Sequence, residues 1–553
     1  MILEKINKTT CPFCLYGCEL TVKEINKANF RIRQVEYDSL LGINKGRLCA
    51  RGNMAVNILE NRRRAVRPKL NGVSMSWANA LETIKQALKK FRPEEVAITY
   101  DVNNTNEELK EIYQFCKSNN ITNLASSYLE PEIVFRYTIS EDVKYGHFSD
   151  LEESKVFLIV GDVFTKSPLI AHPILEAKYK DRAHRLYYID SVKTRIAGFA
   201  HKFLWVPVSA EPLALLAIIA EIYKSSESKI ISEKSFNQLR KLLPKIYELI
   251  KVNPEDIKEV AQSLINLDPG TILVSFDYAK TQDPLLIWSL GQILQILLGN
   301  NKKIIYTALA QTPKGLISFG ELFEKLKSGN IKVLINFGDI FPYWYPQVHS
   351  ELDRLSLLVL TSPFRYESYN QGFLLPTASI LEKAGTINSL WGQSKLSPLA
   401  SPIDGSKTTS EILKAISEFS TEDIEIKTKI QLDINKVYER ALNFIESFSC
   451  DDRFTVIGSE SPIGYRGYFD SEEEVLWINS KTAVRYQIVS FSKIKLITDN
   501  YENEFKIKIT DGQLSNVGMV LVNTPKNRKF FKLEIDNLTK EIIIKPVIGS
   551  LIF

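Results

Sequence analysis

The 553-residue sequence lacks a stretch long enough to cross a membrane, and it lacks an excess of charge. Its longest apolar runs, around residues 213–222 and 285–298, fall short of the about 18 apolar residues of a transmembrane helix, so we expect buried helices there. The formal net charge of only +5 gives no reason to expect nucleic acid as a partner. The first residues show neither a secretory nor a twin-arginine pattern. We therefore expect a cytoplasmic protein without direct membrane insertion, reaching any membrane only through partner subunits.

Residue types that bind transition metals are also scarce, with five histidines and six cysteines. Four of the cysteines nevertheless form one motif, C-x2-C-x3-C-x30-C, made of Cys11, Cys14 and Cys18 in CPFCLYGC and Cys49 in NKGRLCARGN. Structural zinc usually takes two pairs of ligands, whereas each iron of a [4Fe-4S] cluster takes one thiolate, which suits three crowded thiols plus one distant thiol. The motif therefore predicts a [4Fe-4S] cluster. Zinc and buried structural cysteines are the alternatives.

The residues around these cysteines resemble a known family. CPFCLYGCELTV followed by GINKGRLCARG is similar to the start of the large subunit of molybdopterin-dependent oxidoreductases, which include formate dehydrogenases and the large iron–sulfur subunit of complex I. In that family a Lys or Arg lies between the cluster and the pterin. The resemblance therefore implies that Arg51 is a relay between the cluster and the pterin, where a cation also offsets the negative charge of a reduced cluster.

The length and the hydrophobic pattern predict an α/β protein of several domains. Residues 1–60 read as a small [4Fe-4S] domain of short strands. Continuous apolar strands that alternate with helices predict a doubly wound α/β domain over residues 126–329. A second such domain combines residues 61–125 with 330–420. The strand-rich segment 430–553, with strands expected at 493–498, 505–509, 519–522, 530–534 and 542–544, resembles a shortened form of the family's C-terminal β-barrel domain.

Glycine and polar residues lie at several expected strand ends, where open α/β sheets bind ligands. The segments VGDVFTKSPLIAHPI, YYIDSVKTRIAGFAHKF, LLGNNKKIIYTALAQ and INFGDIFPYWYPQ resemble the family's pterin-binding loops. The resemblance implies a molybdopterin guanine dinucleotide cofactor with Mo or W. The residues that it assigns to the dinucleotide in these segments are Gly161, Asp162, Asp190, Gly299, Asn300, Gly338 and Asp339.

A further stretch, ESYNQGFLLPTASILEKAGTINSLWGQ, keeps the spacing of another motif of the family. The cofactor-binding residues that it implies are Glu367, Gly385, Thr386, Asn388 and Gln393.

The metal-ligand position departs from the family pattern. Formate dehydrogenases carry a Cys or selenocysteine followed by His in the corresponding loop, whereas SSYLEPEIVF has Glu130 and Pro131 there. A carboxylate can ligate molybdenum, so Glu130 is a candidate catalytic metal ligand. The alternative is a degenerate site, with Glu130 in a solvated loop.

Two functions therefore compete. The first is an iron–sulfur electron-transfer subunit of a redox complex, without a functional molybdenum site. The second is a catalytic molybdo- or tungsto-pterin oxidoreductase subunit. In either case we expect iron–sulfur or flavin partner subunits, docked near the first domain and its basic run Arg62, Arg63, Arg64 and Arg67. A wide cleft would favour catalysis. A packed cleft, suggested by bulky Phe164, Phe341 and Trp344 at strand ends, would favour electron transfer.

Overall fold

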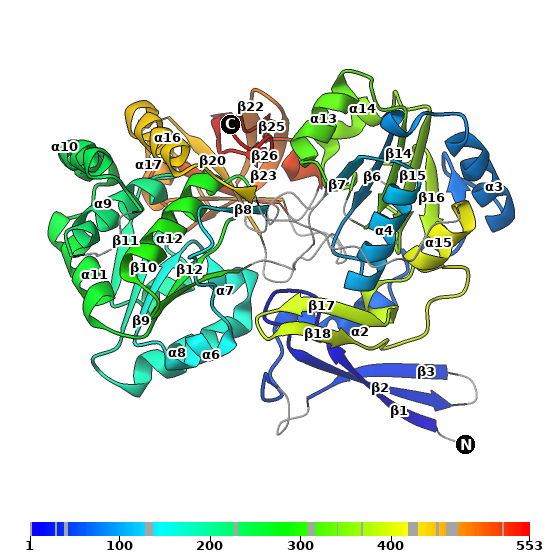
Figure 1. The fold of residues 1–553 in the computed structure, drawn as a ribbon, viewed down its shortest axis with the longest axis horizontal. Coiled ribbons are helices and arrows are strands. Elements are labelled where there is room, and N and C mark those ends of the chain that lie inside the picture. Colours follow the sequence, from blue (N-terminus) through cyan, green and yellow to red (C-terminus); the bar gives the residue numbers. More distant parts are fainter. Residues whose placement is uncertain are drawn as a thin grey trace.

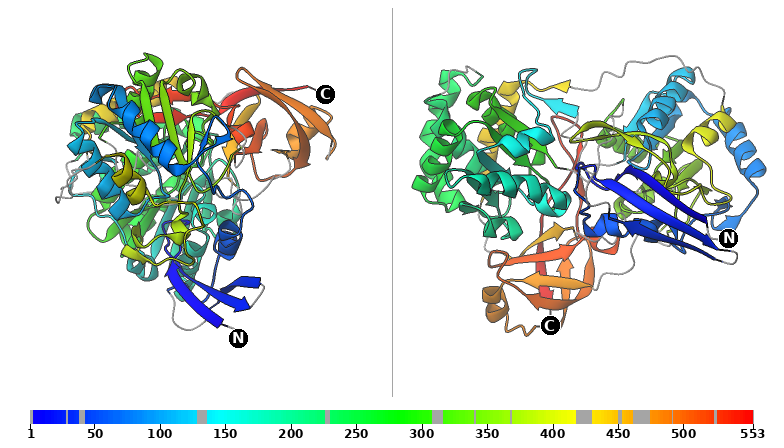
Figure 2. Two further views of the ribbon diagram at one scale, coloured as in Figure 1. Left: turned by 90° about the vertical axis from the view of Figure 1, so that its right-hand side faces the viewer. Right: turned by 90° about the horizontal axis from the view of Figure 1, so that it is seen from below.

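The structure is a computed structural model of the chain. It describes residues 3–27, 30–37, 43–127, 136–225, 230–307, 316–339, 341–366, 369–417, 430–449, 453–460, 474–490, 492–522 and 525–552. Figures 1 and 2 show two α/β lobes side by side, a three-stranded sheet below them and a β-barrel behind them. No helix within these residues has the length and apolar character to span a membrane.

The chain begins with an antiparallel sheet of β1 (Leu3–Thr10), β2 (Glu19–Lys27) and β3 (Phe30–Glu36). β1 pairs with β2, and β2 pairs with β3. The loop between β1 and β2 carries the first three cysteines, and two short helices, α1 (Ala50–Asn53) and α2 (Ala55–Leu59), follow the fourth. This sheet extends away from the lobes in Figure 2.

The first lobe is built on a five-stranded parallel sheet in the order β11-β10-β9-β12-β13. Its strands are β9 (Val156–Val160), β10 (Arg185–Asp190), β11 (Lys202–Trp205), β12 (Gly270–Val274) and β13 (Lys302–Tyr306). Alternate strand residues face opposite ways. Leu158 and Ile189 pack with α9 (Glu211–Tyr223), α10 (Glu233–Ile250), α11 (Pro254–Asn266) and α12 (Pro284–Leu298), whereas Phe157 and Ile159 pack with α6 (Phe148–Glu153) and α8 (Ala171–Lys180). Helices on both faces make the lobe doubly wound, as expected.

The second lobe is a seven-stranded sheet in the order β5-β4-β16-β15-β14-β6-β7. Its strands are β4 (Lys69–Leu70), β5 (Val73–Ser74), β6 (Val96–Tyr100), β7 (Asn123–Ser126), β14 (Val333–Phe337), β15 (Leu357–Ser362) and β16 (Phe373–Pro376). The central strands are parallel, and β4 and β5 add two short antiparallel strands at one edge. The helices α3 (Trp77–Leu88), α4 (Asn106–Ser118) and α15 (Thr409–Ile416) cover one face, and α13 (Phe319–Lys327) packs on the other. The chain thus leaves this sheet after β7 and returns to it at β14.

The C-terminal region forms a closed six-stranded barrel, in the order β20-β24-β21-β23-β22-β27. The strands are β20 (Thr455–Ser459), β21 (Val475–Ile478), β22 (Lys493–Thr498), β23 (Glu502–Ile509), β24 (Val517–Leu521) and β27 (Val547–Ile552). The strands expected at 530–534 and 542–544 are not barrel strands. They correspond to β25 (Leu533–Ile535) and β26 (Ile542–Ile544), which pair only with each other. The barrel closes through β27, a strand that periodicity did not reveal.

Candidate iron–sulfur and cofactor site

The loop between β1 and β2 brings three cysteines together. The amide of Cys11 donates to the carbonyl of Cys18 at 2.7 Å and closes the loop. Gly17 has φ of +68°, and a Cβ there would lie 2.7 Å from Cβ of Ser389. Glycine is therefore required at this turn both for its backbone conformation and for the close approach of the neighbouring segment.

The four cysteine thiols of the motif lie within electrostatic reach of one another. Burial raises the pKa of Cys11 and Cys18, and the charges of the other thiols, Cys49 among them, raise it further. Burial also raises the pKa of Cys14, and the positive charge of Arg51 partly offsets this rise by favouring the thiolate. A bound metal centre replaces the thiol protons, so this donor set suits a group that holds thiolates. Within the described ranges, no three Cys, His, Asp or Glu side chains stand close enough together for a single metal ion.

Arg51 joins the cysteine region to the five-stranded lobe. Cys49 immediately precedes α1, and Arg51 in that helix is only 2% exposed. Its Nη2 donates to the carbonyl oxygens of Thr165 at 2.6 Å and Lys166 at 2.8 Å. Its Nε is buried without a hydrogen-bond partner among the residues that the structure describes. The predicted relay residue therefore lies beside the thiols, with one donor still to be satisfied.

The residues that hold Arg51 belong to the short helix α7 (Val163–Lys166), which follows β9. Asp162 caps this helix by accepting from the amide and the hydroxyl of Thr165, at 3.1 and 2.6 Å. The ammonium of Lys166 lies 2.8 Å from Glu460, which follows β20 of the barrel, and 3.8 Å from Asp277. One loop thus connects the cysteine region, the lobe and the barrel.

The hairpin of β17 (Gly385–Ser389) and β18 (Gly392–Leu396) also packs against the cysteine loop. The amide of Leu390 donates to the carbonyl of Leu15 at 2.8 Å, and the indole of Trp391 donates to the carbonyl of Tyr16 at 2.9 Å. Four residues predicted to bind cofactor lie on this hairpin, namely Gly385, Thr386, Asn388 and Gln393.

These hairpin side chains already have partners within the protein. Thr386 donates twice to Glu107 of α4, from its amide and from its hydroxyl, both at 2.8 Å. Gln393 donates to the hydroxyl of Thr386 at 2.8 Å. Asn106 donates to Asn388 at 3.5 Å. The hairpin is therefore tied both to the second lobe and to the cysteine loop.

The carboxyl edge of the five-stranded sheet is filled by an ion network. Asp190, at the end of β10, is 0% exposed and accepts from Lys280 at 2.8 Å and from Tyr188 at 2.5 Å. Lys280 also lies 3.0 Å from Asp277. Burial lowers the pKa of Lys280, but the charges of Asp190 and Asp277 outweigh it and raise this pKa. Burial and the charge of Asp277 raise the pKa of Asp162 to about 6.

Further polar side chains are buried at the same edge. The hydroxyls of Ser191 and Thr281 and the amide of Gln513 have no hydrogen-bond partner among the described residues. Ser191 and Gln513 are 0% exposed, and Thr281 is 7% exposed. In an open dinucleotide cleft, the side chains that line the cleft would be accessible to water. Ser191, Thr281 and Gln513 are instead enclosed by protein.

Two of the predicted dinucleotide residues lie at the opposite edge of this sheet. Gly299 and Asn300 precede β13, and in a parallel sheet the starts of the strands face away from their carboxyl ends. Gly299 and Asn300 therefore lie away from Gly161 and Asp190, and their assignment to the cofactor stays a prediction. Gly161 is at the correct edge, but a Cβ there would lie 2.2 Å from the carbonyl oxygen of Ser275. Its close backbone contact is with protein.

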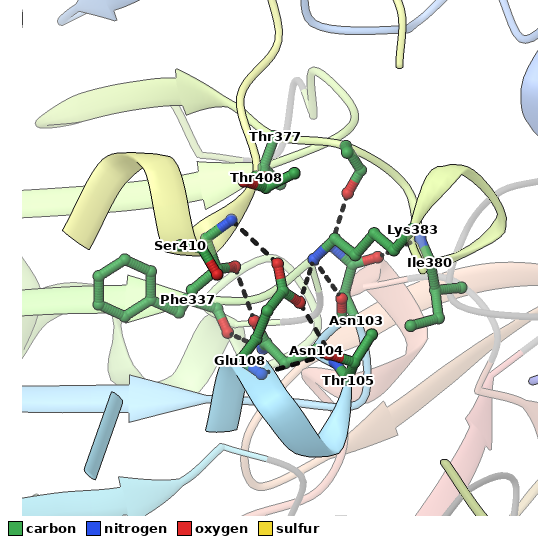
Figure 3. A network of polar contacts seen from close by, with 12 residues as sticks. Asn103, Asn104, Thr105, Glu108, Phe337, Thr377, Ile380, Lys383, Thr408 and Ser410 are labelled. Atoms are coloured by element: carbon green, nitrogen blue, oxygen red, sulfur yellow. Dashed lines mark hydrogen bonds and ion pairs between the residues drawn. The ribbon is translucent and has the colours of Figure 1, made fainter. Parts of the chain in front are cut away.

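The carboxyl edge of the seven-stranded sheet is also occupied. Asp339 is 0% exposed, and its amide donates to Asp101 at 2.7 Å. A Cβ on Gly338 would lie 2.3 Å from the carboxyl carbon of Asp101. Farther along this edge, Lys383 bonds to Glu108 at 2.8 Å and to the carbonyl of Asn103 at 2.6 Å, as Figure 3 shows. Protein groups therefore satisfy this edge as well.

Other expectations concern residues around these edges. Arg64 is buried in an ion pair with Glu382, with contacts of 2.9 and 2.6 Å. It is therefore not part of a solvated or partner-facing surface, as its place in a basic run suggested. Phe341 and Trp344 are buried, as expected of residues that close a cleft, and Phe164 is half-buried. The candidates Glu130 and Glu367 lie outside the described residues.

Sequence reasoning missed the residues that close these edges. Lys280, Lys166 and Arg528 are each less than 10% exposed. The guanidinium of Arg528 lies 4.1 Å from the ring centre of Tyr278, in the first lobe, and 4.3 Å from that of Trp344, in the second. A lysine in the segment that follows a buried strand, as in FDYAKTQDP after β12, was an available signal for Lys280. No local pattern marks Arg528.

Comparison with known proteins gives the family. A family model described as the molybdopterin oxidoreductase Fe4S4 domain matches residues 4–61, and one described as molybdopterin oxidoreductase matches residues 66–419. The chain belongs to the molybdopterin oxidoreductase family. These matches support an iron–sulfur cluster and a molybdopterin cofactor and do not distinguish molybdenum from tungsten.

Curated relatives of this family member are subunits of larger enzymes. The F420-dependent formate dehydrogenase subunit alpha of Methanocaldococcus jannaschii is 26% identical over 300 residues, which are 52% of this chain and 42% of that protein. A subunit of the NADH-quinone oxidoreductase of Rhizobium meliloti is 24% identical over 225 residues, 39% of this chain and 26% of that protein. The chain thus matches less than half the length of these relatives. Acetylene hydratase from Pelobacter acetylenicus has a TM-score of 0.74 at 12% identity, covering 98% of this chain and 99% of that chain, which shows a shared fold.

The two cofactors of the family fit this chain unequally. The four thiols beside Arg51 form a suitable donor set for an iron–sulfur cluster. The guanine dinucleotide does not fit the strand ends in the same way, because Asp190 and Gly338 are engaged by Lys280 and Asp101. The Nε of Arg51, which has no hydrogen-bond partner among the described residues, suggests a further acceptor next to the thiols.

Proposed function

We propose that this chain is an iron–sulfur electron-transfer subunit of a formate dehydrogenase-like redox complex, without a functional molybdenum site. The observation that carries the proposal is the contrast between two regions. The four thiols lie within electrostatic reach of one another and of a buried, oriented arginine, whereas Lys280 occupies the strand end where a dinucleotide would bind. The first region offers thiol ligands for a redox centre, and at the second the charges of Lys280, Asp190 and Asp277 are paired within the protein.

The residues around the thiols support one-electron transfer. A [4Fe-4S] cluster, when bound, supplies reversible one-electron chemistry. Arg51 places a fixed positive charge next to Cys11 and Cys14, which favours the more negative, reduced state. The two carbonyls that hold its guanidinium keep this charge in one position. Burial of Cys11, Cys14 and Cys18 keeps water away from their sulfurs.

The complex itself is part of the proposal. A lone cluster needs a nearby redox centre, so we expect an iron–sulfur or flavin subunit to dock close to the cysteine domain. A cavity of about 220 Å³ lies there, lined by Tyr16, Arg47, Phe148 and Trp391 among others. A native complex in which this chain is the sole redox subunit would contradict the expectation. The cytoplasmic location stays a prediction.

A second candidate is a catalytic molybdo- or tungsto-pterin subunit. The unpartnered Nε of Arg51 favours it, because this donor points to an acceptor beyond the carbonyls of Thr165 and Lys166. This candidate requires Glu130 to act as the metal ligand.

Metal and pterin analysis of protein purified without oxygen separates the two candidates. We expect about four irons per chain, the electron paramagnetic resonance signal of a reduced [4Fe-4S] cluster, and neither stoichiometric molybdenum or tungsten nor pterin. Cys49→Ala should lose the iron, and Cys116→Ala, a buried thiol outside the motif, should retain it. One zinc and no iron would overturn the cluster. Stoichiometric metal and pterin would establish the catalytic alternative.

A further inference from the structure

The segment 525–544 runs between the two lobes, and the proposed function makes no use of it. It leaves the barrel after β24, forms the short helix α18 (Pro525–Arg528) followed by β25 and β26, and rejoins the barrel at β27. Figure 1 shows β25 and β26 between the lobes. We call this segment the strap.

The strap is hydrogen-bonded to both lobes. In the first lobe, the hydroxyl of Tyr137 donates to the carbonyl of Thr539 at 2.9 Å. In the second lobe, the hydroxyl of Ser318 donates to the carbonyl of Lys540 at 2.7 Å. A Cβ on Gly320, in α13, would overlap this same carbonyl oxygen, so α13 and the strap are in close contact. Two consecutive residues of the strap therefore contact different lobes.

Arg528 contacts aromatic rings of both lobes. It is 7% exposed, and its Nε donates to the carbonyl of Val522 at 2.8 Å, which holds the guanidinium in place. The guanidinium carbon lies 4.1 Å from the ring centre of Tyr278 in the first lobe. It lies 4.3 Å from the ring centre of Trp344 and 5.7 Å from that of Tyr345, both in the second lobe. A cation within about 6 Å of an aromatic face is attracted by the electron density of the ring, and burial strengthens this attraction.

Aromatic rings, rather than a carboxylate, surround the buried charge of Arg528. Within the described ranges, no ion pair includes this residue. The side-chain amide of Gln347 donates to the carbonyls of Arg528 and Phe531, at 2.7 and 2.8 Å. The second lobe therefore binds the backbone of the strap at Arg528, while the guanidinium of the same residue contacts the first lobe.

We propose that the strap is a clamp that holds the two lobes together, and that the guanidinium of Arg528 closes the clamp by contacting both Tyr278 and Trp344. Without the guanidinium, the space next to these two rings is empty, so local opening between the lobes costs less free energy. A planar cation can enter this space only by replacing the Arg528 side chain. The clamp contains no cluster ligand, so this inference goes beyond the proposed function and does not depend on it.

The test is hydrogen–deuterium exchange of the full chain, measured by mass spectrometry in the peptides that contain Tyr278 and Trp344. Arg528→Ala should exchange about tenfold faster than wild type in both peptides, because buried cation–π contacts no longer oppose local opening. Methylguanidinium at millimolar concentration should slow the exchange of Arg528→Ala and leave wild type unchanged. Arg485→Ala is the matched control, because the exposed Arg485 lies 5.7 Å from the ring centre of Tyr486 within the barrel. Both peptides should exchange at the wild-type rate in this control.

The outcomes decide the inference in either direction. Wild-type exchange in either peptide of folded Arg528→Ala would overturn the clamp, and so would faster exchange that methylguanidinium does not slow. If Arg528→Ala does not fold, Arg528→Lys is measured instead, because it keeps the charge but lacks the planar group that stacks on aromatic rings. Faster exchange in both peptides of that variant supports the clamp, and exchange at the wild-type rate overturns it. Iron content enters none of these measurements, so failure of the clamp and failure of the proposed function are separate results.

Discussion

Replacing Lys280 with methionine should strongly destabilise the five-stranded lobe. Methionine keeps an unbranched side chain of similar length and removes the ammonium that contacts Asp190 at 2.8 Å and Asp277 at 3.0 Å. Asp190 would then remain in the interior with hydrogen bonds from Tyr188 and the amide of Val192, and without its cation. Lys166, 3.8 Å from Asp277, is the remaining positive charge next to this network.

The magnitude follows from burial, because both members of the pair are nearly inaccessible to water. Breaking a buried ion pair by removing one partner costs about 3–5 kcal/mol. For a domain of about 150–250 residues, each kcal/mol lowers the melting temperature by roughly 2–4 °C. We therefore expect the lobe to melt roughly 6–20 °C lower in the variant. The double variant, which also carries Asp190→Asn, should regain part of this loss, because Asp190 is then no longer a buried charge without its cation, and Asp277 keeps Lys166 at 3.8 Å.

Differential scanning calorimetry resolves this effect, since the lobe and the barrel can give separate transitions. The four proteins of the cycle are the wild type, Lys280→Met, Asp190→Asn and the double variant. The coupling energy from this double-mutant cycle measures the interaction between Lys280 and Asp190. Lys280→Met melting within about 2 °C of wild type would refute the argument. If that variant also contained more bound pterin, Asp190 would have a ligand as its partner instead of Lys280.

Three further expectations concern other buried groups. Burial and the charge of Asp190 raise the pKa of Glu211 from 4.5 to about 8. The folded protein therefore holds a proton that the unfolded chain loses, so the stability should fall as the pH rises between these values. Thermal melts of Glu211→Gln should show a smaller fall over this pH range. Arg64→Met should cost about 3–5 kcal/mol by leaving Glu382 buried and unpaired, whereas Arg62→Ala, at an exposed position, should leave the melting temperature unchanged. Gly17→Ala should lower the iron content, because its Cβ would collide with the neighbouring hairpin, and a full complement of iron would contradict this.

Much of the fold could be read from the sequence because its signals are local. The strands of the two lobes are short apolar runs, and the Gly-Asp pair after β9 correctly marked a carboxyl edge. The cysteine spacing alone indicated that one turn carries three ligands, and Gly17 in that turn has the positive φ that the spacing requires. The expected β-barrel is present, although two of its predicted strands pair elsewhere.

The domain boundaries and the roles of the strand-end residues remain predictions, and the structure gives the reason. A polar residue at a strand end can bind a ligand or pair with another part of the protein. The local sequence looks the same in both cases. Gly299 precedes β13, and a residue before a parallel strand lies at the opposite edge from the residues that follow the strands. Its place in the fold therefore depends on strand direction, which the Gly-Asn pair by itself does not show.

The sequence by itself determined which residues can form the metal-binding turn and which runs become buried strands, because spacing and hydrophobic period act over a few residues. Only the tertiary structure decided which charges meet. Lys280 and Asp190 are 90 positions apart, and Arg64 and Glu382 are 318 apart. Burial makes such pairs strong, but their partners are set by the packing of whole lobes, which no local pattern encodes.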